Sequence, residues 1–297
     1  MVLFWKKKRQ KSIKSLFAQA TNKELPEVRT RVRINEYTME VNLMRNCSHV
    51  HTATAYKDFE IDPNGDFQTD SVVNIYPFPF KSETKVAMGT EEDKMYFYGY
   101  KQFEEVFFYR KQKDREVYDL VLPAHEYNLE ALDNVFRMIF SSKCIEKQMI
   151  LLHASCIVKD GKAVLFIGQS GAGKSTISRL SGFPLIHDDL ISVKRLGDKK
   201  VRIMTVPFKP MFKKHVFEGE IDTIYRIYQS QNNYLETIDK REQLAQMLFA
   251  LWSFDDFRSE KASPQDRDIL RFCKEIVGNV EIKKLYFTKS NDFLKLL

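Results

Sequence analysis

The chain has 297 residues and combines 43% hydrophobic with 29% charged residues, as soluble proteins of one large or two ordinary domains do. No apolar run approaches the ~20 residues that a membrane-spanning helix needs, so we expect no transmembrane segment. The net charge of +7 favours anionic partners, but no nucleic-acid-binding signature accompanies it, and we expect no nucleic acid to be bound.

The N-terminus carries a run of basic residues. We interpret residues 1–20 as a solvated basic tail, with contact to a membrane surface or an acidic partner as the alternative. The apolar residues of this tail precede the basic ones, which is the reverse of the order in a secretory signal. The four cysteines form no CxxC pair, which suits a reducing compartment. We therefore expect a cytoplasmic protein.

Residues 30–120 alternate apolar and polar positions or are rich in β-branched and aromatic residues, which predicts strands. The sequence EVFFYRKQKDREVYDLVL predicts a hairpin around a charged turn. Cys47, His49 and His51 would share one face of a strand and could hold zinc, but a fourth ligand is not evident and a structural strand is preferred. We predict that residues 1–122 form a β-rich N-terminal domain.

After residue 122 the apolar period becomes helical, in PAHEYNLEALDNVFRMIFSS, which predicts an amphipathic helix. The strand MILLHASCIV, the tight turn KDGK and the strand AVLFIG then predict an antiparallel hairpin. A glycine-rich turn follows, and the residues 175–181 are expected to form a short helix. FPLI predicts a short strand, and LISVKRLGDKKVRIMTV predicts a second hairpin turning at Gly197 and Asp198.

Two later helices have recognisable ends. Asp239 with Glu242 resembles a capping box at the start of KREQLAQMLFALWSF. Ser263 and Pro264 open PQDRDILRFCKEIV, and Gly278 is expected to close it. The strand EIKKLYF ends the pattern. We predict that residues 123–297 form an α/β domain with a mixed sheet, because the first two strands are antiparallel neighbours.

The segment GQSGAGKS fits the phosphate-loop pattern G-x-x-x-x-G-K-[ST] without a mismatch, between a predicted strand and a predicted helix. Glycines let successive backbone N–H groups point at phosphate oxygens, and a lysine reaches the outer phosphates. The hydroxyl that follows the lysine can bind Mg²⁺. The expected nucleotide-binding residues are Gly168, Ser170, Gly171, Ala172, Gly173, Lys174, Ser175 and Thr176.

Asp188 and Asp189 follow the strand FPLI, which is expected beside the phosphate loop. Adjacent residues on a strand point to opposite sides, so both carboxylates serve one centre only if the chain turns there. One carboxylate could then bind a metal while its neighbour meets an acceptor hydroxyl. His153 lies in the strand next to the phosphate-loop strand and is read either as a core histidine or as a group that orients the base.

The sequence LLHASCIVKDGKAVLFIGQSGAGKST, followed by FPLIHDD, resembles the HPr kinase/phosphorylase superfamily. The resemblance implies a fold similar to phosphoenolpyruvate carboxykinase and an ATP- and Mg²⁺-dependent serine kinase. It implies that Asp188 is the general base, that Asp189 and Ser175 bind Mg²⁺, and that His153 and Lys174 belong to the catalytic set.

Thr176 stands where the bifunctional members carry glutamate, and the Leu-Glu-x-Arg-Gly signature of those enzymes has no match. The sequence LHAS and the short spacing from the loop to the aspartates look more like the HPr-kinase-like branch of the superfamily that phosphorylates a serine of lasso-peptide precursors. The expected partner is therefore a peptide or protein bearing a serine, and a homo-oligomer is left open. One alternative is a nucleotide-binding regulatory protein without catalysis. The other is a small-molecule kinase or carboxykinase-like enzyme that acts on free serine or an oxaloacetate-type acid.

Overall fold

The computed structural model describes residues 26, 28–44, 56–78, 95–99, 106–111, 115–123, 129–196, 201–208, 217–252 and 264–297. Residues 1–135 and 136–297 form two compact units. The division falls inside a helix, whereas the sequence places a boundary before that helix, at residue 122, and that boundary stays a prediction. The basic tail, the Cys47–His51 cluster and the turn at residues 197–198 lie outside the described residues. None of the described helices is long and apolar enough to cross a membrane.

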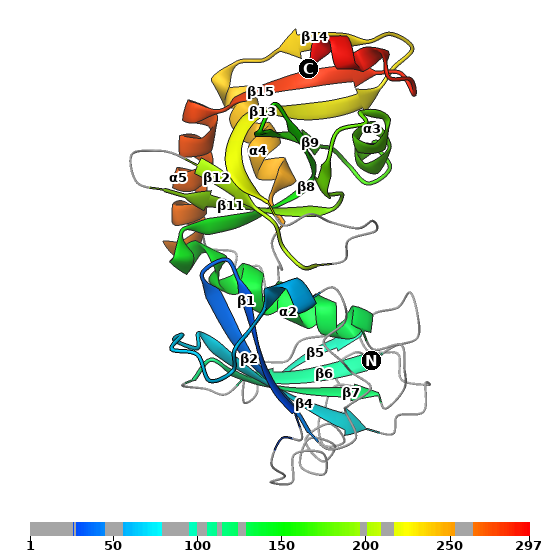
Figure 1. Ribbon diagram of the computed structural model, residues 1–297. Coiled ribbons are helices and arrows are strands. Elements are labelled where there is room, and N and C mark those ends of the chain that lie inside the picture. The colour runs from blue at the N-terminus through cyan, green and yellow to red at the C-terminus, as the bar shows by residue number, and fades with distance from the viewer. Residues whose placement is uncertain are drawn as a thin grey trace, which may run out of the picture. The chain divides into compact units, whose positions relative to one another are not determined.

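The first unit is built on one mixed sheet (Figure 1). Its strands, in the order in which they lie side by side, are β3 (Glu60–Ile61), β1 (Val28–Ile34), β2 (Tyr37–Leu43), β4 (Ser71–Phe78), β7 (Val117–Pro123), β6 (Val106–Lys111) and β5 (Met95–Gly99). The short helix η1 (Lys57–Phe59) precedes β3. β4 pairs in parallel with both β2 and β7, and the outer pairs are antiparallel. The β-rich character predicted for this region is confirmed.

Local chemistry accounts for the hairpins of this sheet. Asn35 adopts a positive φ of 59°, which lets the chain turn between β1 and β2 without glycine. The predicted hairpin around the charged turn is present, because β6 and β7 pair antiparallel. Alternate residues such as Val32, Ile34, Val73 and Ile75 are fully buried, which is the pattern of strands with a face in a core.

The helix α2 (Leu129–Cys144) fulfils the prediction of an amphipathic helix after the first sheet. Its buried residues include Leu132, Val135, Phe136 and Ile139, and these follow the helical spacing seen in the sequence. The short helix η2 (Ile145–Lys147) continues it and ends at Gln148, which has the left-handed φ of 56°.

The second unit is also built on a mixed sheet. Its strands are β8 (Met149–Lys159), β9 (Lys162–Ile167), β10 (Leu185–His187), β11 (Leu190–Arg195), β12 (Val201–Met204), β13 (Glu218–Gln229), β14 (Tyr234–Thr237) and β15 (Glu281–Phe287). β9 lies between β8, to which it is antiparallel, and β13, to which it is parallel. β10 and β11 both pair with β8, at successive parts of that long strand. β13 is also parallel to β15, and β14 pairs antiparallel to β15 at the sheet edge.

Helices cover both faces of this sheet, and each face has its own buried cluster (Figure 1). On one face α4 (Lys240–Ala250) and α5 (Pro264–Asn279) contribute residues such as Met247 and Phe272. On the other face α3 (Lys174–Leu180) and the C-terminal η3 (Asp292–Leu296) contribute Ile177 and Phe293. The glycine-rich loop that fits the phosphate-loop pattern joins β9 to α3, so it follows the end of a strand that lies between β8 and β13.

The hairpin of β8 and β9 confirms the prediction from KDGK, since Asp160 and Gly161 both have positive φ. The Asp239 side chain accepts a hydrogen bond from the Glu242 amide at 2.8 Å, which confirms the predicted cap of α4. Two predicted helix ends are wrong. α4 ends at Ala250, before the WSF residues, and α5 continues through Gly278 to Asn279. The mixed α/β architecture itself is confirmed.

Candidate functional site

The phosphate-loop sequence forms a tight connection between β9 and α3. Gly171 and Gly173 have positive φ values of 79° and 100°, which glycine adopts without strain. At Gly168 the constraint is space instead, because an added Cβ would lie 2.8 Å from the Ala172 Cβ and 3.2 Å from Ile227. The three glycines of the motif are therefore needed for this backbone path. Gly173 also packs on Phe287, where an added Cβ would lie 3.0 Å from the ring.

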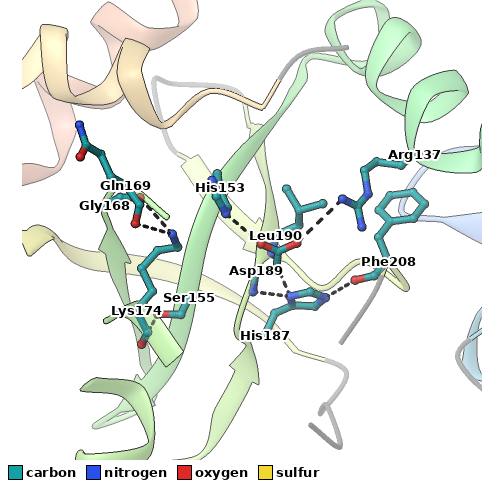
Figure 2. A network of polar contacts seen from close by, with 10 residues as sticks. All are labelled: Arg137, His153, Ser155, Gly168, Gln169, Lys174, His187, Asp189, Leu190 and Phe208. Atoms are coloured by element: carbon teal, nitrogen blue, oxygen red, sulfur yellow. Dashed lines mark hydrogen bonds and ion pairs between the residues drawn. The ribbon is translucent and has the colours of Figure 1, made fainter. Parts of the chain in front are cut away.

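The Lys174 side chain folds back over the loop. Its Nζ donates to the carbonyls of Gly168 at 3.0 Å and Gln169 at 3.4 Å (Figure 2). Burial lowers the pKa of the Lys174 ammonium, Arg226 lowers it further, and the charge of Asp189 acts in the opposite direction. An ammonium that is buried among carbonyls is stabilised by any anion that enters the loop.

A buried hydroxyl pair fastens the start of α3 to β8. Ser155 Oγ donates to the Lys174 carbonyl at 3.1 Å, and Ser178 Oγ donates to Ser155 Oγ at 2.8 Å. Ser155 and Ser178 are 0% and 1% exposed, so water does not compete for these bonds. The orientation of Lys174 is thus fixed from both ends, by the loop carbonyls at its tip and by β8 at its backbone.

Asp188 and Asp189 lie between β10 and β11, where the chain breaks as predicted. Asp189 Oδ1 lies 2.9 Å from His153 Nε2, and its Oδ2 lies 3.9 Å from Arg137 Nη1 (Figure 2). Burial acts to raise the pKa of the Asp189 carboxyl, but the hydrogen bond and charge of His153, followed by the charge of Arg137, hold it below its usual value. Asp189 is therefore a fixed anion, and His153 contacts Asp189.

A cavity of about 540 Å³ joins the loop to the aspartates. Its lining consists of His153, Ser170, Gly171, Gly173, Lys174, Ser175, Thr176, Asp188, Asp189, Gln229 and Lys289. Of the eleven residues that the sequence nominates, this lining omits Gly168 and Ala172, which form the turn itself. Asp188 is only 3% exposed and lines this cavity.

Three residues at this site are missing from the set that the sequence predicts. Gln229, at the end of β13, donates to the Gly171 carbonyl at 3.1 Å and so ties the loop to the neighbouring strand. Lys289 adds a second lysine to the cavity wall. Arg137 comes from α2 and packs over the rings of Phe208 and Trp252, at 5.9 and 5.4 Å, while it reaches Asp189. None of the three lies in a motif, and no local signal marks them.

The donor atoms of the cavity suit a hard divalent cation. The Ser175 hydroxyl and the Asp188 and Asp189 carboxylates are oxygen donors that line the same space. Mg²⁺ prefers oxygen ligands and usually keeps several waters or phosphate oxygens, so it needs only one or two protein carboxylates. No group of three or more His, Cys, Asp or Glu side chains that could hold a metal by itself occurs within the described residues. This donor set therefore fits Mg²⁺ bound together with a phosphate better than a closed structural metal site.

No protein-family model matches the chain, and no curated protein matches it. Among solved structures, the chain is similar to the HPr(Ser) kinase/phosphatase from Coxiella burnetii, at 17% sequence identity and a TM-score of 0.22. The match covers 30% of this chain and 72% of that chain.

Proposed function

We propose that the protein is an ATP- and Mg²⁺-dependent kinase that transfers a phosphoryl group to a serine hydroxyl of a peptide or protein. The observation that supports the proposal is that the phosphate loop, Lys174, Asp188 and Asp189 line one cavity. Phosphoryl transfer requires a cradle for the donor phosphates, charge stabilisation and a group that receives the proton of the acceptor. Each requirement has a candidate among these residues.

The loop residues hold the triphosphate. Backbone N–H groups that converge in a glycine-rich turn bind phosphate oxygens, and a lysine at the end of the turn adds a full positive charge. Lys174 bonds two loop carbonyls, at 3.0 and 3.4 Å, and would exchange these neutral acceptors for the outer phosphates. Gln229 donates to the Gly171 carbonyl at 3.1 Å and so satisfies one acceptor of the loop that would otherwise repel an anion.

The Ser175 hydroxyl and the Asp189 carboxylate would hold Mg²⁺, as the resemblance to the HPr kinase/phosphorylase superfamily implies. When bound, the ion would stabilise the negative charge on the phosphate oxygens during transfer. The residues around Asp189 suit this role, because His153 and Arg137 keep its carboxyl ionised and oriented.

Asp188 is the proposed general base. Its carboxylate takes the proton of the serine hydroxyl as the hydroxyl oxygen forms a bond to the γ-phosphorus. The bond from the γ-phosphorus to the bridging oxygen breaks, and ADP leaves with that electron pair. The product is a phosphoserine, and the proton on Asp188 is released to solvent. Lys174 stabilises the charge that develops on the transferred group.

The acceptor is proposed to be a serine of a ribosomal precursor peptide of the lasso type. This part of the proposal rests on the sequence resemblance alone, in the LHAS wording and in the short spacing from the loop to Asp188. A cytoplasmic location and a peptide partner follow from the same proposal.

The test combines the purified chain with ATP, Mg²⁺ and a panel of serine peptides, and follows the addition of one phosphate by mass spectrometry. Asp188→Asn should abolish transfer and keep nucleotide binding. The matched control is Asp160→Asn, the same chemical change at an exposed turn of the β8–β9 hairpin, which should keep full activity. Tight ATP binding without transfer to any acceptor would overturn the kinase proposal and favour a regulatory nucleotide-binding protein.

A further inference from the structure

His187 is the last residue of β10 and is only 1% exposed, and its imidazole holds three backbone groups together. Its Nδ1 accepts hydrogen bonds from the Asp189 amide at 3.1 Å and from the Leu190 amide at 3.0 Å. Its Nε2 lies 2.8 Å from the Phe208 carbonyl oxygen. Figure 2 shows the ring between these groups, below the Asp189 carboxylate. Both ring nitrogens are therefore engaged.

These contacts determine which nitrogen carries the proton. A backbone N–H can only donate, so Nδ1 must offer its lone pair to the two amides. A carbonyl oxygen can only accept, so Nε2 must carry the proton and donate it to Phe208. This assignment from the hydrogen-bond network makes the ring neutral. His187 thus has no donor or acceptor left for a substrate, although it is the residue next to Asp188.

The Asp189 and Leu190 amides lie where the hydrogen-bonded pairing with β8 is interrupted. The pairing of β10 with β8 shifts register between Leu185 and His187, and regular pairing resumes only where Leu190 of β11 lies opposite His153. In between, the Asp189 carbonyl still accepts from the Ala154 amide at 3.0 Å, whereas the Asp189 and Leu190 amides turn to the imidazole. The ring therefore replaces lost ladder partners, which allows a break in a buried strand without unsatisfied amides.

His187 is also linked indirectly to the carboxylate of Asp189, through Phe208 and Arg137. The ring of Phe208, whose carbonyl accepts from His187, packs under the Arg137 guanidinium at 5.9 Å. Arg137 Nη1 in turn lies 3.9 Å from Asp189 Oδ2. The backbone of Asp189 and its side chain are thus held by one closed set of contacts through His187, Phe208 and Arg137.

We infer that His187 is a positioning residue: its imidazole sets the turn that directs Asp188 and Asp189 into the same cavity. The consequence for catalysis rests on the proposed kinase function, whereas the consequence for the backbone does not. Two adjacent strand residues would otherwise point to opposite sides of the sheet. Loss of the turn should therefore slow transfer and leave nucleotide binding at the phosphate loop largely intact.

Two substitutions distinguish the role of Nδ1 from the role of Nε2. His187→Asn keeps an acceptor close to the position of Nδ1 and loses the bond to Phe208. His187→Gln reaches the position of Nε2, can donate to the Phe208 carbonyl, and loses the acceptor for the two amides. We expect His187→Gln to lower kcat by about 100-fold, because misplacement of a reacting group by about 1 Å costs about 100-fold in rate. His187→Asn keeps the acceptor for the two amides, so we expect kcat to fall by less than about 10-fold. KM for ATP should stay within about threefold in both variants.

The control removes two hydrogen bonds that a buried side chain makes to the backbone of another segment. Thr205 is 3% exposed, and its Oγ1 donates to the Phe217 carbonyl at 3.1 Å and accepts from the Phe217 amide at 2.9 Å. Thr205→Val should reduce thermal stability about as much as His187→Gln and leave kcat unchanged. Equal kcat in His187→Asn and His187→Gln would overturn the inference. A loss of kcat in Thr205→Val as large as that in His187→Gln would also overturn it.

A second measurement needs no activity. Long-range ¹H–¹⁵N correlation of the imidazole should show a neutral ring protonated at Nε2, and hydrogen exchange should show protected Asp189 and Leu190 amides. Those amides should lose protection in His187→Gln and keep it in His187→Asn. A ring protonated at Nδ1, or unchanged protection in His187→Gln, would overturn the inference. If the wild-type chain transfers no phosphate but these signals are as expected, the kinase proposal fails and the positioning role stands.

Discussion

His153 Nε2 lies 2.9 Å from Asp189 Oδ1, and this contact joins the long strand β8 to the turn between β10 and β11. The imidazole is 38% exposed at its side chain, so it faces the cavity as well as the carboxylate. His153 therefore orients Asp189, and Asp188 lines the same cavity as the phosphate loop.

Removal of the His153 ring should affect transfer more than nucleotide binding. His153→Ala leaves Asp189 with Arg137 as its cationic neighbour at 3.9 Å, and we expect kcat to fall by about 10- to 100-fold with little change in ATP affinity. His153→Gln, which can still donate to Asp189, should recover most of the rate. The measurement is steady-state transfer together with equilibrium ATP binding, and a larger loss in binding than in rate would contradict the assigned role.

Asp189 should make stability depend on pH. Its pKa lies below the unfolded value of 3.8, so the folded state favours the ionised form. The stabilisation is fully present above 3.8 and is lost as the pH falls through the lower folded value. In urea unfolding with a chelator present, Asp189→Asn should be less stable than the wild type at about pH 7, and the two curves should converge in strong acid. A difference that is the same at both pH values would contradict this account.

Gly168→Ala should damage the loop through sterics alone. The new Cβ would lie 2.8 Å from the Ala172 Cβ, which is closer than two carbon atoms can pack, so the turn must open. We expect ATP affinity to fall at least about 10-fold, since the amides that are proposed to hold phosphate then diverge.

Gly278→Ala is the matched control for the loop substitution. Beyond the helix backbone around it, no atom of the described residues lies within 4 Å of the position that the new methyl carbon would take. The helix α5 should therefore gain up to about 1 kcal/mol, and ATP affinity should stay at the wild-type value. Isothermal titration measures the affinity of both variants, and thermal unfolding measures their stability. Equal ATP affinity in the two variants would contradict the steric account of Gly168.

Arg226 should contribute little to stability despite its position in the core. The residue is 6% exposed, its guanidinium packs over Phe249 at 4.1 Å, and its Nη1 has no hydrogen-bond partner among the described residues. Burial of such a charge costs free energy that the ring contact only partly returns. We expect Arg226→Met to lie within about 1 kcal/mol of the wild type in chemical unfolding.

Lys284→Met provides the contrast for Arg226. Its ammonium lies 2.8 Å from Glu236 and 2.7 Å from Glu242, so its loss leaves two carboxylates facing each other. The melting temperature should fall in Lys284→Met and stay level in Arg226→Met. A clear fall in Arg226→Met would show that the guanidinium has a stabilising anionic contact in solution.

The structural elements around the candidate site that the sequence predicts correctly are those whose signals are local. The β8–β9 hairpin follows from Asp160 and Gly161, which supply two positive φ values, and the loop follows from its glycines and Lys174. The end of an apolar run predicts the break at Asp188 and Asp189. Each of these features is decided by a few neighbouring residues, so the sequence alone is enough.

Other features depend on contacts between distant segments. Arg137, Gln229 and Lys289 reach the site from α2, the end of β13 and the residues after β15, and only the tertiary fold brings them together. The parallel pairing of β9 with β13 leaves no local trace either. At Asn35 the turn uses a residue other than glycine, so the alternating pattern alone does not reveal the hairpin of β1 and β2.

The floor of the phosphate loop comes from the far end of the chain. Gly173 rests on the Phe287 ring, and Phe287 meets the fully buried Phe293 of η3 edge to face, with ring centroids 6.1 Å apart. A substitution at Phe293 should therefore shift the Phe287 ring and, with it, the backbone at Gly173, the residue just before Lys174. Genetic screens for loss of ATP binding should recover substitutions in the C-terminal turn as well as in the glycine motif.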